Sequence, residues 1–272
     1  MGKVYATSDW HGCTAPALKL MSYLKEDDTL YFLGDAIDRG KDGMQLFNLL
    51  LNDPRVIFIK GNHEDMMEKS MKDFLSFDDK LEFRIFSEDF NIWMWNGGGQ
   101  TYKDIKKKSV LNIKDILEKL KNMSYKEIYN SPKGHQVILT HAGFSPSADS
   151  APSNGDLLWS REHFCDDWNE LDNNIYIVHG HTPVQYLKYE YSYNGAPWLT
   201  DEEMNRRFSW TDEVNPEDSK IIKYSKNHKI DIDLCTIVSN KVALLDLDTL
   251  EVKYFEGEDE NEINKMDKEQ TS

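Results

Sequence analysis

The sequence predicts an α/β fold in which parallel strands deliver polar residues to one edge of a sheet. Five short apolar runs have the composition of buried strands, and amphipathic helical patterns follow the first three of them. Ligands collect at the carboxyl ends of strands in sheets with helical crossovers, so the residues after these runs are expected to lie together. The five strand-end segments are Ser8–Gly12, Gly34–Gly40, Gly61–Glu64, His141–Gly143 and His179–Pro183.

The N-terminal part of the chain is expected to form three strand–helix units. Thr14 is the expected N-cap of the first helix, and Asp42 is the expected N-cap of the second. The third helix is expected from about Asp65, where methionines recur at helical spacing. The strands of these units are expected over 3–9, 29–35 and 56–61.

The rest of the chain is less regular. Lys80–Thr101 is aromatic-rich and closes on three consecutive glycines, for which we expect a tight loop, since no Lys follows them as in a phosphate-binding P-loop. A helix is expected from about Ile113 to Tyr129. Further strands are expected over 136–141 and 175–179, with closing antiparallel strands over 229–233, 241–245 and 252–255.

We expect one domain over residues 1–255, with an insertion at about 184–227. The insertion is rich in Tyr and Trp without a clear period, and it suits either a surface subdomain or a lid over the site. Residues 256–272 hold two basic and seven acidic residues, a balance of 2 − 7 = −5, and only two large apolar ones. Such a segment cannot bury enough apolar surface to fold, so we expect a disordered acidic tail.

Composition argues against several classes of partner. The formal net charge is −16, which disfavours a long nucleic-acid interface, because such binding depends on Lys and Arg. No apolar run approaches the roughly 20 residues of a membrane span, and no signal-peptide stretch begins the chain. The three cysteines lack a Cys-x-x-Cys pair and suit a reducing compartment. We expect a soluble cytoplasmic protein without nucleic-acid or membrane partners, of a subunit number that the sequence does not indicate.

The strand-end segments supply ligands for divalent metal ions. A carboxylate directly after a buried strand, such as Asp35, is costly unless it is paired or bound to a cation. Its two oxygens can bridge two ions held roughly 3.5–4 Å apart. Carboxylate, amide and imidazole ligands suit Mn, Fe or Zn better than Ca. His179 is the exception, because a hydrogen bond behind His181 explains it better than ligation. The expected ligands are Asp9, His11 and Asp35 for one ion, and Asp35, Asn62, His141 and His181 for the other.

The same segments supply residues for phosphoryl transfer. A water bound to such ions has a pKa near neutrality and can attack phosphorus directly. Arg39 can hold two phosphoryl oxygens as a fork, and Arg161 is the second candidate clamp. His63 is placed to protonate the leaving alkoxide, and Asp38 is placed to orient His63 and keep it protonated.

Together these segments resemble the signature of calcineurin-like metallophosphoesterases. Gly-Asp-x-x-Asp-Arg-Gly at 34–40 and Gly-Asn-His-Glu at 61–64 narrow the resemblance to the phosphoprotein phosphatase branch, the serine/threonine phosphatases. Leu157–Glu162 is similar to the bacterial members and to symmetrical dinucleoside tetraphosphate hydrolases. Ser8 stands where the first motif often has Gly, and Pro183 stands where the wider superfamily has another metal-binding His, a difference that again indicates this branch.

This resemblance covers about residues 3–183 and, loosely, 229–255. It implies a four-layer αββα sandwich with mixed sheets and a dinuclear site that is often supported by Mn. It places the six ligands named above on the family's metal positions. It also places Arg39, Asn62 and Arg161 on phosphate contacts, and His63 with Asp38 on the acid pair.

The leading hypothesis is a metal-dependent phosphomonoesterase, a serine/threonine protein phosphatase acting on a phosphoprotein or a small phosphoester. One rival is hydrolysis of dinucleoside tetraphosphates, in which aromatic residues between 186 and 210 stack on a base. A second is a metal-bound interaction module without chemistry, which would show a missing ligand or acid, whereas every such position is filled. A nuclease is disfavoured by the acidic balance of the chain.

Overall fold

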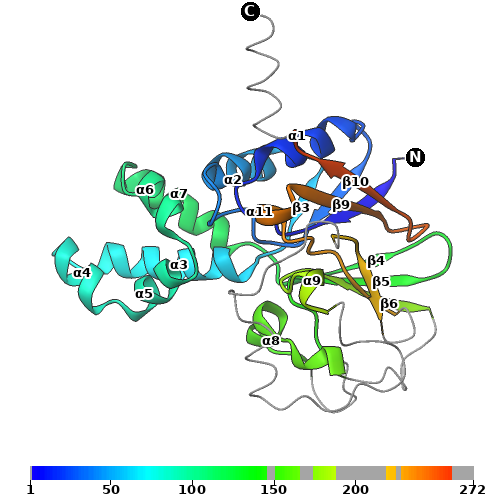
Figure 1. Cartoon of the computed structure of the whole chain (residues 1–272). Helices are drawn as coiled ribbons and strands as arrows, with labels where there is room; N and C mark the ends of the chain where they lie inside the picture. The colour runs from blue at the N-terminus through cyan, green and yellow to red at the C-terminus, as the bar shows by residue number, and fades with distance from the viewer. Residues whose placement is uncertain (1, 146–150, 166–173, 188–218, 225–227, 259–272) are drawn as a thin grey trace, which may run out of the picture.

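Two β-sheets of mixed direction lie at the centre of the protein (Figure 1). The computed structural model describes residues 2–145, 151–165, 174–187, 219–224 and 228–258. Within these residues each sheet has five strands. Helices alternate with the first three strands, so the predicted α/β class is confirmed.

The first sheet has the strand order β10-β9-β1-β2-β3. Its parallel part, β1 to β3, comes from the three expected strand–helix units, and Thr7 pairs with Phe32 near the strand ends. The β9–β10 hairpin adds to β1 in antiparallel direction, as the alternating pattern predicted. The strands are β1 (Val4–Thr7), β2 (Thr29–Phe32), β3 (Val56–Phe58), β9 (Lys241–Asp246) and β10 (Val252–Glu256).

The second sheet has the strand order β4-β5-β6-β8-β7. Strands β5, β6 and β8 are parallel, and β4 and β7 are antiparallel edge strands. The strand predicted over 229–233 is β8, and it pairs with β7 in antiparallel direction as predicted. On its other side it pairs with β6 in parallel direction, which the sequence analysis did not expect; a long connection between the two strands allows such a crossover. The strands are β4 (Lys126–Asn130), β5 (Gln136–Thr140), β6 (Ile175–His179), β7 (Ile222–Tyr224) and β8 (Lys229–Asp231).

An apolar layer joins the two sheets. It contains fully buried side chains of both, such as Leu245 from the first sheet and Val137, Leu139 and Val178 from the second. Burying apolar surface at roughly 25 cal/mol per Å² is the main force that holds such layers together. The polar strand ends lie at the margin of this layer, where they are fixed by a rigid scaffold.

Helices cover the outer faces of both sheets (Figure 1). Helices α1 (Thr14–Tyr23) and α2 (Gly43–Asn52) belong to the core cluster of the first sheet. Helix α8 (Asn154–Trp159) packs its Leu157 against Ile177 of the second sheet. The layers therefore follow the order helix, sheet, sheet, helix, which agrees with the predicted four-layer sandwich. Shorter helices are η1 (Glu162–Cys165), α9 (Val184–Leu187) and α11 (Thr236–Ser239).

A helical lobe extends from one side of the sandwich (Figure 1). Its helices are α3 (Asn62–Ser76), α4 (Lys80–Phe86), α5 (Glu88–Trp95), α6 (Gly99–Ile105) and α7 (Val110–Lys121). The helix expected from about Asp65 begins at Asn62, so the Gly-Asn-His-Glu motif forms its first turn. The tight loop expected at the three glycines is only partly present, because the last of them, Gly99, begins α6.

The helix predicted to reach Tyr129 was wrong at its C-terminal end. Helix α7 ends at Lys121, and the following residues form β4, which pairs with β5 in antiparallel direction. Alternate residues of β4 are half-buried and exposed, as on an edge strand with one covered face. Hydrogen bonding across the sheet thus outweighed the local helical spacing.

Most of the predicted insertion and nearly all of the predicted acidic tail lie outside the described residues. Of the stretch 184–227, helix α9 and strand β7 are described, and β7 is paired within the second sheet. In the parts of the chain that can be described, no helix combines the length and apolar character of a membrane span.

Candidate metal centre

The predicted site residues follow the carboxyl ends of β1, β2, β3, β5 and β6. They lie in loops, except that Asn62 and His63 form the first turn of α3, and Arg161 comes after α8. Backbone hydrogen bonds tie neighbouring loops together. Asp9 N–H donates to Gly34 O at 3.1 Å, and His11 N–H donates to Asp35 O at 3.0 Å. Parallel pairing therefore brings the strand-end residues together, as the sequence predicted.

Backbone conformation marks the same residues. Nine described non-glycine residues have positive φ, and six of them are predicted site residues. A left-handed backbone costs such a residue about 1–3 kcal/mol, and strain of this kind gathers at functional sites. The six are Asp9 (56°), His11 (41°), Asp35 (62°), Asp38 (70°), Arg39 (63°) and His181 (70°).

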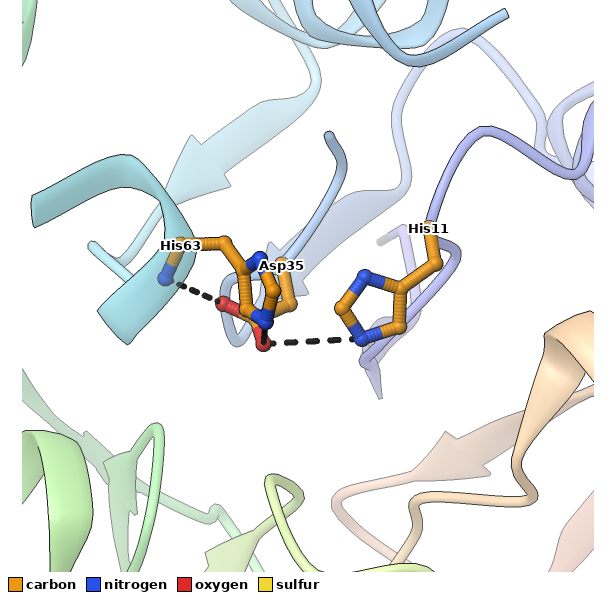
Figure 2. A group of neighbouring side chains, drawn as sticks. All are labelled: His11, Asp35 and His63. Carbon is orange, nitrogen blue, oxygen red and sulfur yellow. Dashed lines mark hydrogen bonds and ion pairs between the residues drawn. The ribbon is translucent and has the colours of Figure 1, made fainter. Parts of the chain in front are cut away.

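Asp35 lies between two clusters of candidate metal ligands. In one cluster its Oδ2 lies 3.6 Å from His11 Nε2 and 3.8 Å from His63 Nε2 (Figure 2). In the other its Oδ1 lies 3.5 Å from His141 Nε2, and His181 completes the group. Because its two oxygens face different imidazoles, Asp35 could contribute one ligand atom to each cluster.

The two other predicted ligands, Asp9 and Asn62, border these clusters. Asp9 Oδ2 accepts a hydrogen bond from His181 N–H at 3.0 Å, and Asp9 Oδ1 lies 4.0 Å from His11 Nε2. Asn62 Oδ1 lies 2.8 Å from His141 Nε2 and 3.1 Å from His181 Nδ1. All six predicted ligands therefore surround one small volume.

The electrostatics of this volume favour a bound cation. Burial raises the pKa of the Asp9 and Asp35 carboxyls well above the usual range, and it lowers the pKa of His141 to about 3. The neutral His141 donates Nδ1–H to Leu33 O at 2.7 Å, so an Nε2 lone pair points at Asn62 Oδ1. Two acceptors at that distance repel each other unless a positive ion lies beside them.

Two ligand atoms at the site lack any hydrogen-bond partner. These atoms, Asp9 Oδ1 and His181 Nε2, are both buried. A buried polar atom left unpaired costs about 1–3 kcal/mol, and a bound cation removes that cost. The residues present thus fit a divalent metal ion held by oxygen and nitrogen ligands.

His63 and Asp38 make the predicted contact. His63 Nδ1–H donates to Asp38 Oδ2 at 2.7 Å, and both side chains are buried. Arg39 donates to His63 Nε2 at 3.1 Å and to His11 Nε2 at 2.7 Å. Burial lowers the pKa of His63, and the Arg39 charge lowers it further. A metal ion bound by His11 would therefore compete with Arg39 for the Nε2 of this imidazole.

Arg161 reaches the site from the segment between α8 and η1. It is half-buried, and its Nε donates to Thr182 Oγ1 at 3.2 Å, directly after His181. Burial lowers the pKa of His181, and the Arg161 charge is the next cause. The two predicted phosphate clamps, Arg39 and Arg161, thus both lie beside the ligand clusters.

His179 lies outside both ligand clusters and forms hydrogen bonds behind them. Its Nε2 lies 2.6 Å from the Tyr224 hydroxyl, which lies 2.9 Å from His163 Nδ1. His163 Nε2–H donates to Ala142 O at 2.7 Å, next to His141. The sequence analysis expected a hydrogen-bonding role for His179 behind His181, but it did not indicate Tyr224 or His163 as partners, because the three rings lie far apart along the chain.

Glu64 is a further site residue to which the sequence analysis gave no role. Its carboxylate accepts backbone hydrogen bonds from Asp35 N (2.8 Å), Ala36 N (3.0 Å) and Gly61 N (3.1 Å). It therefore holds the loop that carries Asp35 against the start of α3. The available signal was the position of Glu64 three residues after Gly61, which is the spacing of a capping box.

Glu64→Gln is expected to lower the free energy of unfolding by about 1–3 kcal/mol, because an amide NH₂ replaces an oxygen that accepts backbone N–H groups. Urea denaturation of the metal-free protein measures the change. Glu82→Gln, at an exposed position on α4, is the matched control and should stay within about 0.5 kcal/mol of the wild type. Equal effects of the two substitutions would contradict the assigned role of Glu64.

Comparison with known proteins gives a family match. The family model for calcineurin-like phosphoesterases matches residues 2–228, a span that includes all the predicted site residues. The chain is 27% identical over 184 residues to serine/threonine-protein phosphatase 2 of Salmonella typhimurium, and the match covers 65% of this chain and 75% of that protein.

Solved structures share the fold. A crystal structure of a candidate diadenosine tetraphosphatase aligns with a TM-score of 0.53 at 17% identity, and the alignment covers 95% of each chain. A metallophosphoesterase from Sphaerobacter thermophilus aligns with a TM-score of 0.51 at 14% identity, and the alignment covers 94% of this chain and 88% of that one. At these identities the likeness concerns the fold alone.

Proposed function

Because the chain belongs to the calcineurin-like phosphoesterase family, whose members are metal-dependent hydrolases, we propose that it is a serine/threonine protein phosphatase. The observation that carries the proposal is the His63–Asp38 pair, in contact at 2.7 Å beside Arg39 and the ligand clusters. Such a pair has the chemistry of a general acid for an alkoxide leaving group.

Two divalent ions are proposed, with Mn²⁺ as the first to test. When bound, they would stabilise charge on the phosphoryl oxygens and lower the pKa of a bound water. The residues proposed to hold them are Asp9, His11, Asp35, Asn62, His141 and His181.

The remaining residues bind the phosphoryl group and move a proton. A phosphate is a stronger acceptor than a neutral imidazole, so it draws the Arg39 guanidinium away from His63 Nε2. The phosphate also offsets the Arg39 charge, which favours the protonated form of His63. Asp38 holds Nδ1–H, and Nε2 can then carry the proton that the leaving oxygen takes. Arg161 is proposed as the second phosphate contact.

A protein substrate is supported by the likeness to the Salmonella serine/threonine-protein phosphatase. One observation favours a nucleotide instead. Trp159 lies edge-on to His181, with the ring centres 5.8 Å apart, and remains 38% exposed. An exposed aromatic ring beside a phosphate-binding site suits stacking on a nucleobase. Hydrolysis of dinucleoside tetraphosphates is therefore the second candidate function.

A phosphorus NMR time course distinguishes the two candidates. Metal-stripped protein is reloaded with Mn²⁺ and offered a phosphothreonine peptide together with diadenosine tetraphosphate. Orthophosphate from the peptide with the dinucleotide intact is the expected result. ADP as the main product would instead assign the second function, and turnover of neither would contradict both. The protein before reloading should be inactive.

A further inference from the structure

The indole of Trp93 contacts the catalytic pair from the helical lobe. Trp93 lies on α5, is fully buried and donates Nε1–H to Asp38 Oδ2 at 2.7 Å. The same oxygen accepts the Nδ1–H of His63 at 2.7 Å. One carboxylate oxygen thus joins the indole and the imidazole, although Trp93 is 55 residues away from Asp38.

Thr101 holds the backbone of Asp38 from the same lobe. The Asp38 N–H donates to Thr101 Oγ1 at 3.1 Å, and Thr101 is buried at the start of α6. Asp38 has a φ of 70°, in the left-handed region that is unfavourable for a residue with a side chain. The two lobe residues therefore fix both the backbone and the carboxylate of a residue that would otherwise relax.

The glycines between Trp93 and Thr101 make this approach possible. Gly98 lies under the indole, and a Cβ there would come within 2.6 Å of Trp93 Nε1. Gly97 has a φ of 98°, and its carbonyl accepts the Arg39 N–H at 3.1 Å. The glycine run thus serves close packing behind Asp38 and Arg39 rather than a phosphate cradle.

We propose that Trp93 is a positioning residue for the general acid, because its indole N–H fixes the Asp38 carboxylate that orients His63. Thr101 acts with it on the Asp38 backbone. This inference rests on the proposed function, and it extends the catalytic machinery into the helical lobe. Without the indole N–H, Asp38 loses the hydrogen bond that sets the direction of its carboxylate.

The hydrogen bonds that lower the pKa of Asp38 come from the same two residues. Burial raises the pKa of this carboxyl to about 7, and bonds from Thr101 and Trp93 oppose the effect. The indole hydrogen bond to Oδ2 therefore favours the ionised carboxylate that the imidazole needs as its acceptor.

The test compares Trp93→Phe on two substrates with Mn²⁺ bound. Phosphothreonine peptide has an alkoxide leaving group that needs a proton, whereas p-nitrophenyl phosphate releases a stable anion. Loss of a hydrogen bond to a charged group is expected to lower kcat on the peptide about 10- to 100-fold, with KM unchanged. On p-nitrophenyl phosphate the loss is expected to stay below about threefold. An equal loss on both substrates would overturn the proposal.

Controls separate positioning from a general structural effect. Trp95→Phe is the matched variant, since Trp95 lies on the same helix but is 92% exposed, and it should leave both activities unchanged. Trp93→Phe should bind Mn²⁺ with wild-type affinity in calorimetry. Added to His63→Asn, it should cause no further loss, because residues acting through one group are not additive. A further loss in that background would overturn the proposal.

Two further tests remain valid even if the Trp93→Phe variant does not fold. Thr101→Val, which keeps the side-chain shape, should show the same dependence on the leaving group. In the metal-free protein, Asp38→Asn should shift the indole N–H resonance of Trp93 in a nitrogen–proton correlation spectrum and leave that of Trp95 unmoved. An unmoved Trp93 signal would overturn the proposal. A wild-type protein inactive on both substrates would contradict the proposed function itself.

Discussion

Asp35→Asn is expected to abolish metal loading and turnover together. Asp35 Oδ1 lies 3.5 Å from His141 Nε2, and its Oδ2 lies 3.6 Å from His11 Nε2, so both clusters share this carboxylate. The substitution replaces it with a neutral amide. Bound metal ions contribute several kcal/mol of transition-state stabilisation, and each 1.4 kcal/mol is tenfold in rate. We expect kcat on a phosphothreonine peptide to fall by at least about 10³-fold.

The fold should survive this substitution. Asp35 Oδ1 accepts His63 N–H at 3.0 Å, and the carbonyl oxygen of Asn can take its place. Calorimetric titration of the metal-stripped protein with Mn²⁺ measures the loading, and circular dichroism checks the fold. Asp115→Asn, at a position 65% exposed on α7, serves as the control and should match the wild type. Wild-type Mn²⁺ stoichiometry in Asp35→Asn would refute the bridging role.

The strand-end loops were predictable because their signal is local. Each parallel strand is a short apolar run, and a charged residue such as Asp9 or Asp35 directly after it has to lie at the sheet edge or meet a cation. Parallel pairing then fixes which loops become neighbours, without further information from the side chains. This explains why the six expected ligands surround one volume in the structure.

The structural features that the sequence did not indicate depend on contacts between segments far apart along the chain. Trp93 and Asp38 are 55 residues apart, and nothing in the aromatic-rich stretch before the glycines shows which ring faces inward. The segment Lys126–Asn130 has spacing compatible with a helix, yet its pairing with β5 makes it a strand. In both cases tertiary contacts decided between local alternatives of similar free energy.

His63→Asn is expected to separate the two roles that its position allows. Its Nε2 lies 3.8 Å from Asp35 Oδ2, within a ligand cluster, while its Nδ1–H is held by Asp38 at 2.7 Å. A ligand needs a free lone pair on Nε2, whereas a general acid needs a proton there. The hydrogen bond to Asp38 suits either role, because a carboxylate at Nδ1 orients a ligating imidazole and also stabilises an imidazolium.

As a general acid, His63 contributes about 10²- to 10⁴-fold to departure of an alkoxide. We therefore expect His63→Asn to lower kcat on the phosphothreonine peptide by that factor, with much smaller loss on p-nitrophenyl phosphate. The variant should bind Mn²⁺ as the wild type does in calorimetry, in contrast to Asp35→Asn. Weakened Mn²⁺ binding with equal losses on both substrates would instead make His63 a metal ligand. In that case Asp38 and Trp93 would orient a ligand, and another residue would have to protonate the leaving oxygen.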